Sequence, residues 1–128
     1  MVSGEIKRIL TPDGELLENQ HYSSPFHIGV RMEIGVRGLE GADLFDIWIC
    51  SLSWLEQQPM PLSGQFLIVV KQFDANSICD FLRHKGASTS GATTTEVFEK
   101  LSRFAYWEYA ELADRPKHWD EMDAHPKE

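Results

Sequence analysis

The sequence predicts an α+β fold in which helices pack on one face of a mainly antiparallel sheet, in the order β-β-β-α-β-α-α. Residues 28–36 and 45–49 alternate apolar with polar side chains, the pattern of strands with one buried face. The connection from Gly38 to Gly41 suits a hairpin, so these two strands are expected to be antiparallel. Two segments with helical spacing follow them, and strands before helices are typical of α+β layers.

The first half of the chain supplies most of the strands. Residues 5–10 form a short strand, which ends at the turn signal Thr-Pro-Asp-Gly of residues 11–14. Residues 15–25 are polar and irregular, and we expect a surface loop there, either without regular structure or with one helical turn. Residues 28–36 alternate without a fault and are therefore the clearest strand of the chain.

A strand runs directly into a short helix within residues 43–58, which read DLFDIWICSLSWLEQQ. Ser53 and Glu56 have the spacing of a capping box, and Pro59 follows soon after. We therefore expect a short helix that begins near Ser53. Because this helix must be anchored to the sheet, Trp54 is expected in the core.

The second half of the chain adds one strand and two helices. Residues 66–73 are more continuously apolar, which predicts a central strand covered on both faces. Asp74 is the expected N-cap of the first helix, and Thr93 with Glu96 forms a capping box for the second. Trp107, at the end of the second helix, is expected in the core. The residues expected to face inward are Ala75, Ile78, Cys79, Leu82, Val97, Leu101 and Phe104 or Ala105.

The length of 128 residues fits one domain that can bury a core without disulfides or metals. We assign residues 1–110 to a single α+β domain and expect residues 111–128, rich in charge, to form a mobile tail. Cys50 and Cys79 fit small buried hydrophobes better than a disulfide. The N-terminus lacks the apolar segment of a signal peptide, and no apolar run is long enough to span a bilayer, so we expect a cytoplasmic protein.

The charge of the chain is strongly unbalanced. Twenty acidic residues against twelve basic ones give a formal charge of −8. Such a surface repels phosphate backbones, which argues against direct binding of DNA or RNA and favours basic partners. Simple solubility is the alternative explanation, since modest negative charge is common in cytosolic proteins.

No catalytic or cofactor-binding motif is complete in the sequence. Residues 86–91 (GASTSG) have the glycine spacing of a phosphate-binding loop, but residues 92–93 are Ala-Thr where that loop needs a lysine. The histidines form no helical metal-binding pair, and the acidic and histidine residues of 118–125 would chelate only weakly. A G-x-S-x-G serine motif is absent. We therefore expect no enzymatic turnover, no cofactor and no metal.

Trp48 is the aromatic residue whose position suggests binding. If its neighbours in the strand face the helices, alternation turns Trp48 to the opposite face with Asp46, near Arg31 and Glu33 of the adjacent strand. A tryptophan among charged residues on an open sheet face is the usual composition of a binding hot spot. The alternative is that the first strand or the tail covers Trp48, which would then belong to the core.

Three of these segments resemble one known family. They are the strand end 49–51 (ICS) with the helix start 53–56 (SWLE), residues 66–74 (FLIVVKQFD), and the helix end 106–108 (YWE). On these segments the chain resembles the immunity protein 8 family of bacterial polymorphic toxin systems, over residues 5–109. The resemblance implies a cytoplasmic inhibitor that neutralises a toxin encoded next to it by tight, stoichiometric association and without turnover.

The resemblance also implies the partner. This is the toxic domain of the cognate toxin, expected to be basic, with the inhibitor a monomer or weak dimer and with neither nucleic acid nor membrane as a partner. Two other functions stay open: a non-immunity interaction subunit of a larger assembly, and a small hydrolase or transferase whose site assembles only in three dimensions. A toxin gene immediately upstream would separate immunity from other interaction roles, and a deep pocket with convergent polar groups would favour an enzyme.

The toxin-binding surface is expected on the outward face of the central hairpin. Glu33, Asp46 and Trp48 would form its centre, and Glu40 and Asp43 its rim. The reason is that an acidic hairpin tip coincides with an aromatic side chain on the polar face. Acidic rim residues would mainly raise the association rate, and Trp48 would mainly set the dissociation rate.

Overall fold

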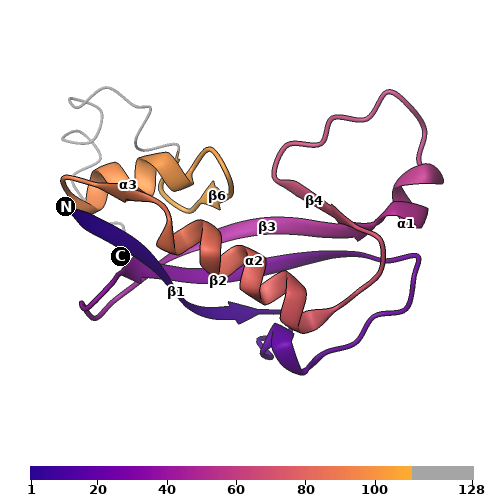
Figure 1. Ribbon diagram of the computed structural model, residues 1–128. Coiled ribbons are helices and arrows are strands. Elements are labelled where there is room, and N and C mark those ends of the chain that lie inside the picture. Colours follow the sequence, from indigo (N-terminus) through magenta and orange to yellow (C-terminus); the bar gives the residue numbers. More distant parts are fainter. Residues whose placement is uncertain (111–128) are drawn as a thin grey trace.

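The computed structural model describes residues 1–110, and the expected tail of residues 111–128 lies outside the described part. The described residues form an α+β structure, as predicted, with a curled mixed sheet and helices along it (Figure 1). Along the sheet the order is β4-β3-β2-β1-β5, and β6 pairs with β3. The strands are β1 (Val2–Leu10), β2 (His27–Val36), β3 (Asp43–Ser51), β4 (Leu67–Val70), β5 (Ser90–Gly91) and β6 (Tyr106–Trp107), and the helices are η1 (Leu17–Asn19, a 3-10 turn), α1 (Leu52–Glu56), α2 (Ala75–Ala87) and α3 (Thr94–Leu101).

The three long strands β1, β2 and β3 form an antiparallel meander. Between β2 and β3 the register places Gly29 opposite Trp48 and Arg31 opposite Asp46. The predicted antiparallel pairing of these two strands is therefore confirmed. Because the side-chain period of a strand is two, this register also fixes which side chains share each face of the sheet.

The position predicted for the strand in residues 66–73 is wrong. The strand is shorter, β4, and it lies at the end of the sheet, parallel to β3, instead of in its centre. Val69 is 42% exposed, so β4 is not covered on both faces. A short apolar run cannot by its periodicity distinguish a central strand from an edge strand, and only the tertiary arrangement decides.

The caps of α2 and α3 are those the sequence predicts. The Asp74 carboxylate accepts a hydrogen bond from the Ser77 N–H (3.1 Å), and the Thr93 hydroxyl accepts one from the Glu96 N–H (3.2 Å). The predicted start of α1 is wrong, because its N-cap is Ser51 and not Ser53. The Ser51 hydroxyl accepts from the Trp54 N–H (3.2 Å) at the point where β3 ends.

The last predicted helix is shorter than expected. It ends at Leu101, and Tyr106 with Trp107 forms the short strand β6 instead of a helix end. The physical reason is a pairing with a distant segment, since Trp107 lies opposite Phe45 of β3. Local helical spacing does not contain that information.

The core lies between the inner face of the sheet and the helices α2 and α3, which run along one side of it (Figure 1). Trp107 is buried there, as predicted, with its ring stacked at 6.1 Å from that of Phe45. Trp54 is only partly buried, which corrects its predicted place in the core. The largest fully buried side chains include Phe45, Ile9, Leu17, Met32, Ile34, Ile47, Ile49, Leu82 and Leu101.

Candidate protein-binding face

The sheet has an outer face on the side away from α2 and α3. Strand alternation and register turn to this side the residues that pair with one another across β1, β2, β3 and β4. We call this surface the outer face; its exposed and partly exposed members include Arg8, His27, Gly29, Arg31, Glu33, Asp46, Trp48, Leu67 and Val69.

Trp48 is the large aromatic side chain near the middle of the outer face. It is 37% exposed, so the residues of β1 do not cover it. Its cross-strand partner is Gly29, and a Cβ atom at position 29 would lie 3.3 Å from the indole Nε1 of Trp48. The missing side chain therefore lets the indole lie against β2. An exposed but laterally supported tryptophan presents a large, rigid contact area.

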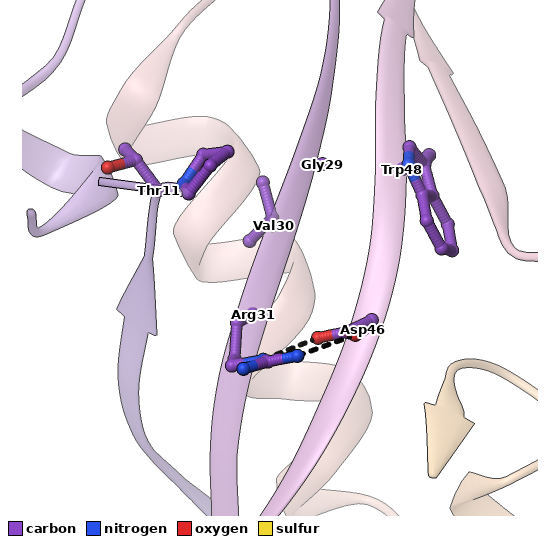
Figure 2. Close-up of a pocket in the computed structure, with 7 residues that line it drawn as sticks. Thr11, Gly29, Val30, Arg31, Asp46 and Trp48 are labelled. Carbon is purple, nitrogen blue, oxygen red and sulfur yellow. Dashed lines mark hydrogen bonds and ion pairs between the residues drawn. The ribbon is translucent and has the colours of Figure 1, made fainter. Parts of the chain in front are cut away.

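Two hollows lie on either side of Trp48. The first has a volume of about 310 Å³ and is lined by residues that include Thr11, Arg31 and Asp46 (Figure 2). The second has a volume of about 300 Å³ and is lined by residues that include His27 and Trp54. Both lie at the lower limit of ligand-pocket volumes, and both are shared with Trp48. The indole is thus a ridge between two depressions, a shape that a protein partner can fit on both sides.

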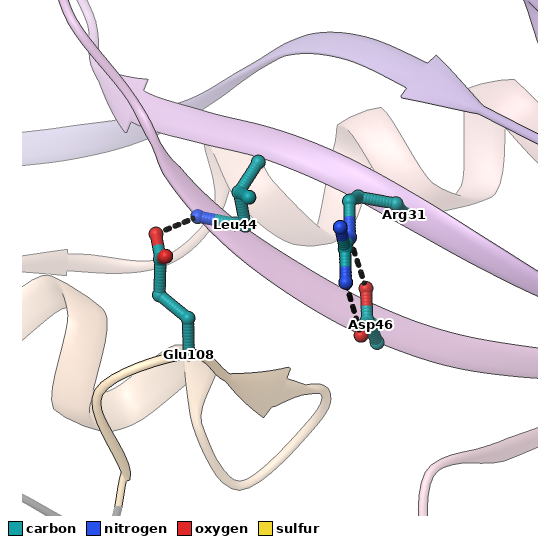
Figure 3. Close-up of polar contacts among 4 residues, drawn as sticks. All are labelled: Arg31, Leu44, Asp46 and Glu108. Atoms are coloured by element: carbon teal, nitrogen blue, oxygen red, sulfur yellow. Dashed lines mark hydrogen bonds and ion pairs between the residues drawn. The ribbon is translucent and has the colours of Figure 1, made fainter. Parts of the chain in front are cut away.

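The charged residues of the outer face are paired with one another. Arg31 donates two hydrogen bonds to the Asp46 carboxylate (2.8 and 3.0 Å), as Figures 2 and 3 show. Arg8 donates two to Glu33 (2.8 and 2.7 Å). The hydrogen bond from Arg8 holds the pKa of Glu33 below its ordinary value. Because such bidentate pairs fix both side chains, the centre of the face is ordered and locally neutral.

In the structure, the residues predicted for the rim of the toxin-binding surface lie apart from those predicted for its centre. Glu33, Asp46 and Trp48 share the outer face, as expected from the sequence. Asp43 instead accepts a hydrogen bond from the indole Nε1–H of Trp107 (2.9 Å) and so anchors β6 to β3. Glu40 is exposed in the hairpin turn, before β3 begins. At roughly 3.4 Å per residue, Asp43 lies about 17 Å along the strand from Trp48.

The β6 strand closes one flank of the outer face. The Glu108 carboxylate accepts a hydrogen bond from the Leu44 N–H of β3 (2.6 Å; Figure 3). This contact, with the pairing of Tyr106 opposite Asp46, brings an aromatic side chain that is 38% exposed beside the face. The ring of Phe66, before β4, meets that of Tyr106 edge-on at 6.3 Å.

Sequence reasoning missed the aromatic residues at the β4 side of the face. The ring of His27 is stacked on that of Trp54, with 4.2 Å between centroids and 7° between planes. Trp54 therefore contributes to the second hollow and not to the core. The available signal was Ser51, a serine three residues before Trp54 and therefore a second possible cap for the same helix. A cap at Ser51 starts the helix two residues earlier than a cap at Ser53 and so changes the direction in which Trp54 points.

Several features of the described residues bear on the metal, thiol, phosphate and membrane functions considered from the sequence. Among residues 1–110, no three histidine, cysteine or acidic side chains come together as metal ligands, and residues 118–125 lie outside that range. Cys50 and Cys79 are buried, and burial raises the pKa of both thiols. Gly86, the first glycine of the loop-like motif in residues 86–91, lies in the last turn of α2 and packs against Ile6 of β1 instead of facing an open cradle. No helix in the described part of the chain has the length and apolar character needed to cross a membrane.

The fold and its outer face define a small α+β protein with an aromatic, ion-paired surface suited to another macromolecule. The model of the immunity protein 8 family matches residues 5–112, most of the chain. The chain therefore belongs to the immunity protein 8 family, a kind of protein that is generally non-enzymatic. Comparison with curated proteins finds no match, and comparison with solved structures finds none either.

Proposed function

We propose that this protein binds and neutralises a cognate bacterial toxin by stoichiometric association in the cytoplasm, without turnover. Membership of the immunity protein 8 family supports the role. The observation that carries the binding mode is the exposed Trp48 between two hollows on the outer face. A tryptophan that a partner can surround on both sides loses water over a large area on binding.

The ion pairs around Trp48 favour specific over non-specific binding. Arg31 and Asp46 already satisfy each other, so a partner that covers them need not leave either charge unpaired. The pair also holds its two side chains in place before the partner arrives, which reduces the entropy lost on binding. Because the two side chains are fixed, their remaining hydrogen-bonding groups lie at defined positions that a toxin surface can match.

The excess of acidic residues would act mainly on the rate of association. A net charge of −8 attracts a basic toxin over a distance that salt shortens. Glu40 is exposed at the hairpin turn and suits this role. Asp43 is a poor test of it, because its carboxylate accepts the indole N–H of Trp107 and a change there would disturb the fold.

The experiment takes the toxic domain of a toxin gene that lies immediately upstream in the genome, where there is one, in an inactivated form, and measures binding kinetics. Trp48→Ala is expected to weaken binding by about 2 kcal/mol, or roughly thirtyfold, mainly through faster dissociation. Phe81→Ala is the matched control, because Phe81 is 53% exposed on α2, away from the outer face. Its affinity is expected to stay within about twofold of the unchanged protein.

Glu40→Lys completes the experiment. We expect a lower association rate at low salt, and the difference from the unchanged protein should shrink as salt is added. Absence of any complex with the upstream toxin domain contradicts the proposed function. A complex that tolerates Trp48→Ala as well as Phe81→Ala moves the interface away from the outer face.

A further inference from the structure

The free edge of the sheet at β4 has the composition of a partner-binding strand. The strand reads LIVV, without a charge or a proline, and it pairs with β3 on one side only. No backbone hydrogen bond joins its other side to any residue in the described part of the chain. Proteins normally protect such an edge with charges, prolines, bulges or a covering element, because it is a template for another strand.

The register shows which backbone groups are available. The Trp48 N–H donates to the Phe66 carbonyl oxygen (2.9 Å), so Phe66 directs its carbonyl toward β3. In a parallel ladder the direction alternates along the strand. Ile68 and Val70 therefore point their N–H groups at β3, while the N–H and C=O groups of Leu67 and Val69 point away from the sheet.

The same two residues present their side chains on the outer face. Leu67 pairs with Trp48 in the sheet and lines the hollow that Trp48 shares with Trp54. Val69 is 42% exposed beside it. A strand added to this edge would therefore continue the outer face, and its alternate side chains would lie next to Leu67 and Val69.

We propose that the cognate toxin contributes an extended, basic segment that pairs with the free edge of β4. This inference rests on the proposed function and specifies how the toxin binds. It assigns the backbone contacts to Leu67 and Val69 and the side-chain contacts to the hollow beside Trp48. The interface thus extends from the centre of the outer face toward β4, and away from the hairpin turn of β2 and β3.

Charge selects the toxin over a second copy of this chain. Pairing β4 with its own copy would bring together two molecules that each carry a net charge of −8. At the end of α1, which packs beside β4, Glu56 is exposed and forms no ion pair with a described residue. Lys71 follows β4 and offsets part of this charge locally. The net attraction still favours a cationic segment.

Amide hydrogen exchange, measured residue by residue, tests the pairing directly. In the free protein we expect fast exchange at Leu67 and Val69 and slow exchange at Ile68 and Val70, which donate to β3. On addition of the inactivated upstream toxin domain, Leu67 and Val69 should become protected by at least about tenfold. Protection of these two amides in the free, monomeric protein would show that the chain already covers its own edge, and would overturn the proposal.

Two variants of one residue separate backbone from side-chain contacts. Val69→Pro removes an outward N–H without touching the ladder to β3 and is expected to weaken toxin binding by at least about fivefold. Val69→Ala keeps that N–H and should weaken binding less. If Val69→Pro does not fold, the exchange measurement on the unchanged protein decides the question alone.

The outcomes distinguish this inference from the proposed function. A stoichiometric toxin complex in which Leu67 and Val69 stay unprotected keeps the immunity function and refutes the strand pairing. A complex in which the two amides are protected supports both. Concentration-dependent protection without toxin, with a doubled mass in solution, identifies a second copy as the occupant and overturns the proposal. Absence of any complex with the toxin domain overturns both.

Discussion

Ser51 supports two parts of the structure at once, and its truncation gives a sharp test of the local packing. The Ser51 hydroxyl accepts hydrogen bonds from the N–H groups of Trp54 (3.2 Å) and Phe26 (3.0 Å). The hydrogen bond from Trp54 caps α1, and the one from Phe26 satisfies a backbone N–H group just before β2 begins. Ser51 itself is fully buried. Ser51→Ala therefore leaves a buried N–H without an acceptor and removes a helix cap.

The expected loss of stability follows from these two contacts. Loss of an N-cap costs about 1 kcal/mol, and an unsatisfied buried N–H costs about 1–3 kcal/mol. Because both contacts share one oxygen, we expect about 2–3 kcal/mol in total for Ser51→Ala. For a chain of this length the midpoint of thermal unfolding should fall by roughly 6–15 °C.

Ser53→Ala is the matched control, two residues away in the same turn. Its hydroxyl lies 3.1 Å from that of Ser51, and the helix cap does not depend on it, so we expect a loss below about 1 kcal/mol. Urea unfolding at neutral pH measures both variants, and amide exchange at Phe26 and Trp54 locates the change. Equal losses for the two serines, or a loss below about 0.5 kcal/mol for Ser51→Ala, would refute this reasoning.

Three further predictions concern other parts of the molecule. Glu33→Gln should make the free energy of unfolding depend less on pH in the acid range. The hydrogen bond from Arg8 lowers the pKa of Glu33 from 4.5. The ionised carboxylate therefore stabilises the fold above pH 4.5, and this stabilisation is lost as the pH falls through the lowered pKa. Urea unfolding between roughly pH 2 and pH 7, the range in which carboxylates titrate, measures the difference, and parallel curves would contradict it. Cys50 and Cys79 should react with a thiol reagent slowly in the folded protein and rapidly in denaturant. The reason is that both thiols are buried and burial raises their pKa. Rapid labelling without denaturant would contradict their burial. Gly35→Ala should destabilise the protein by about 1–3 kcal/mol in the same unfolding assay. The reason is that the new Cβ atom at position 35 would collide with the backbone oxygen of Gly41. An unchanged free energy of unfolding would show that the hairpin adjusts freely.

The sequence predicts most of the fold where the pattern is local. The alternation in β2 and β3 with the short connection between them predicts their antiparallel pairing, and the alternation turns Trp48 away from the helices; both features are found. Asp74 and Thr93 cap their helices as expected because each cap depends on residues within one turn. These features need no knowledge of distant parts of the chain.

The remaining features depend on contacts between distant segments. Ser51 and Ser53 are equally suitable caps by local sequence, and the contact between Ser51 and Phe26 distinguishes them. The role of Asp43 as a partner of Trp107 joins residues that lie far apart in the chain. The edge position of β4 likewise depends on the whole sheet. For the candidate face, alternation predicts its centre but not the aromatic residues beside β4.

The pairing of β6 with β3 bears on the synthesis of the protein. Trp107 pairs with Phe45, a residue from the first half of the chain, so this contact cannot form until the C-terminal segment has left the ribosome. At typical elongation rates the ribosome needs roughly 3–11 s to add residues 52–107. During that interval the flank of β3 later covered by β6 is open on the nascent chain. The flank of the outer face beside β6 is therefore completed after the hairpin of β2 and β3.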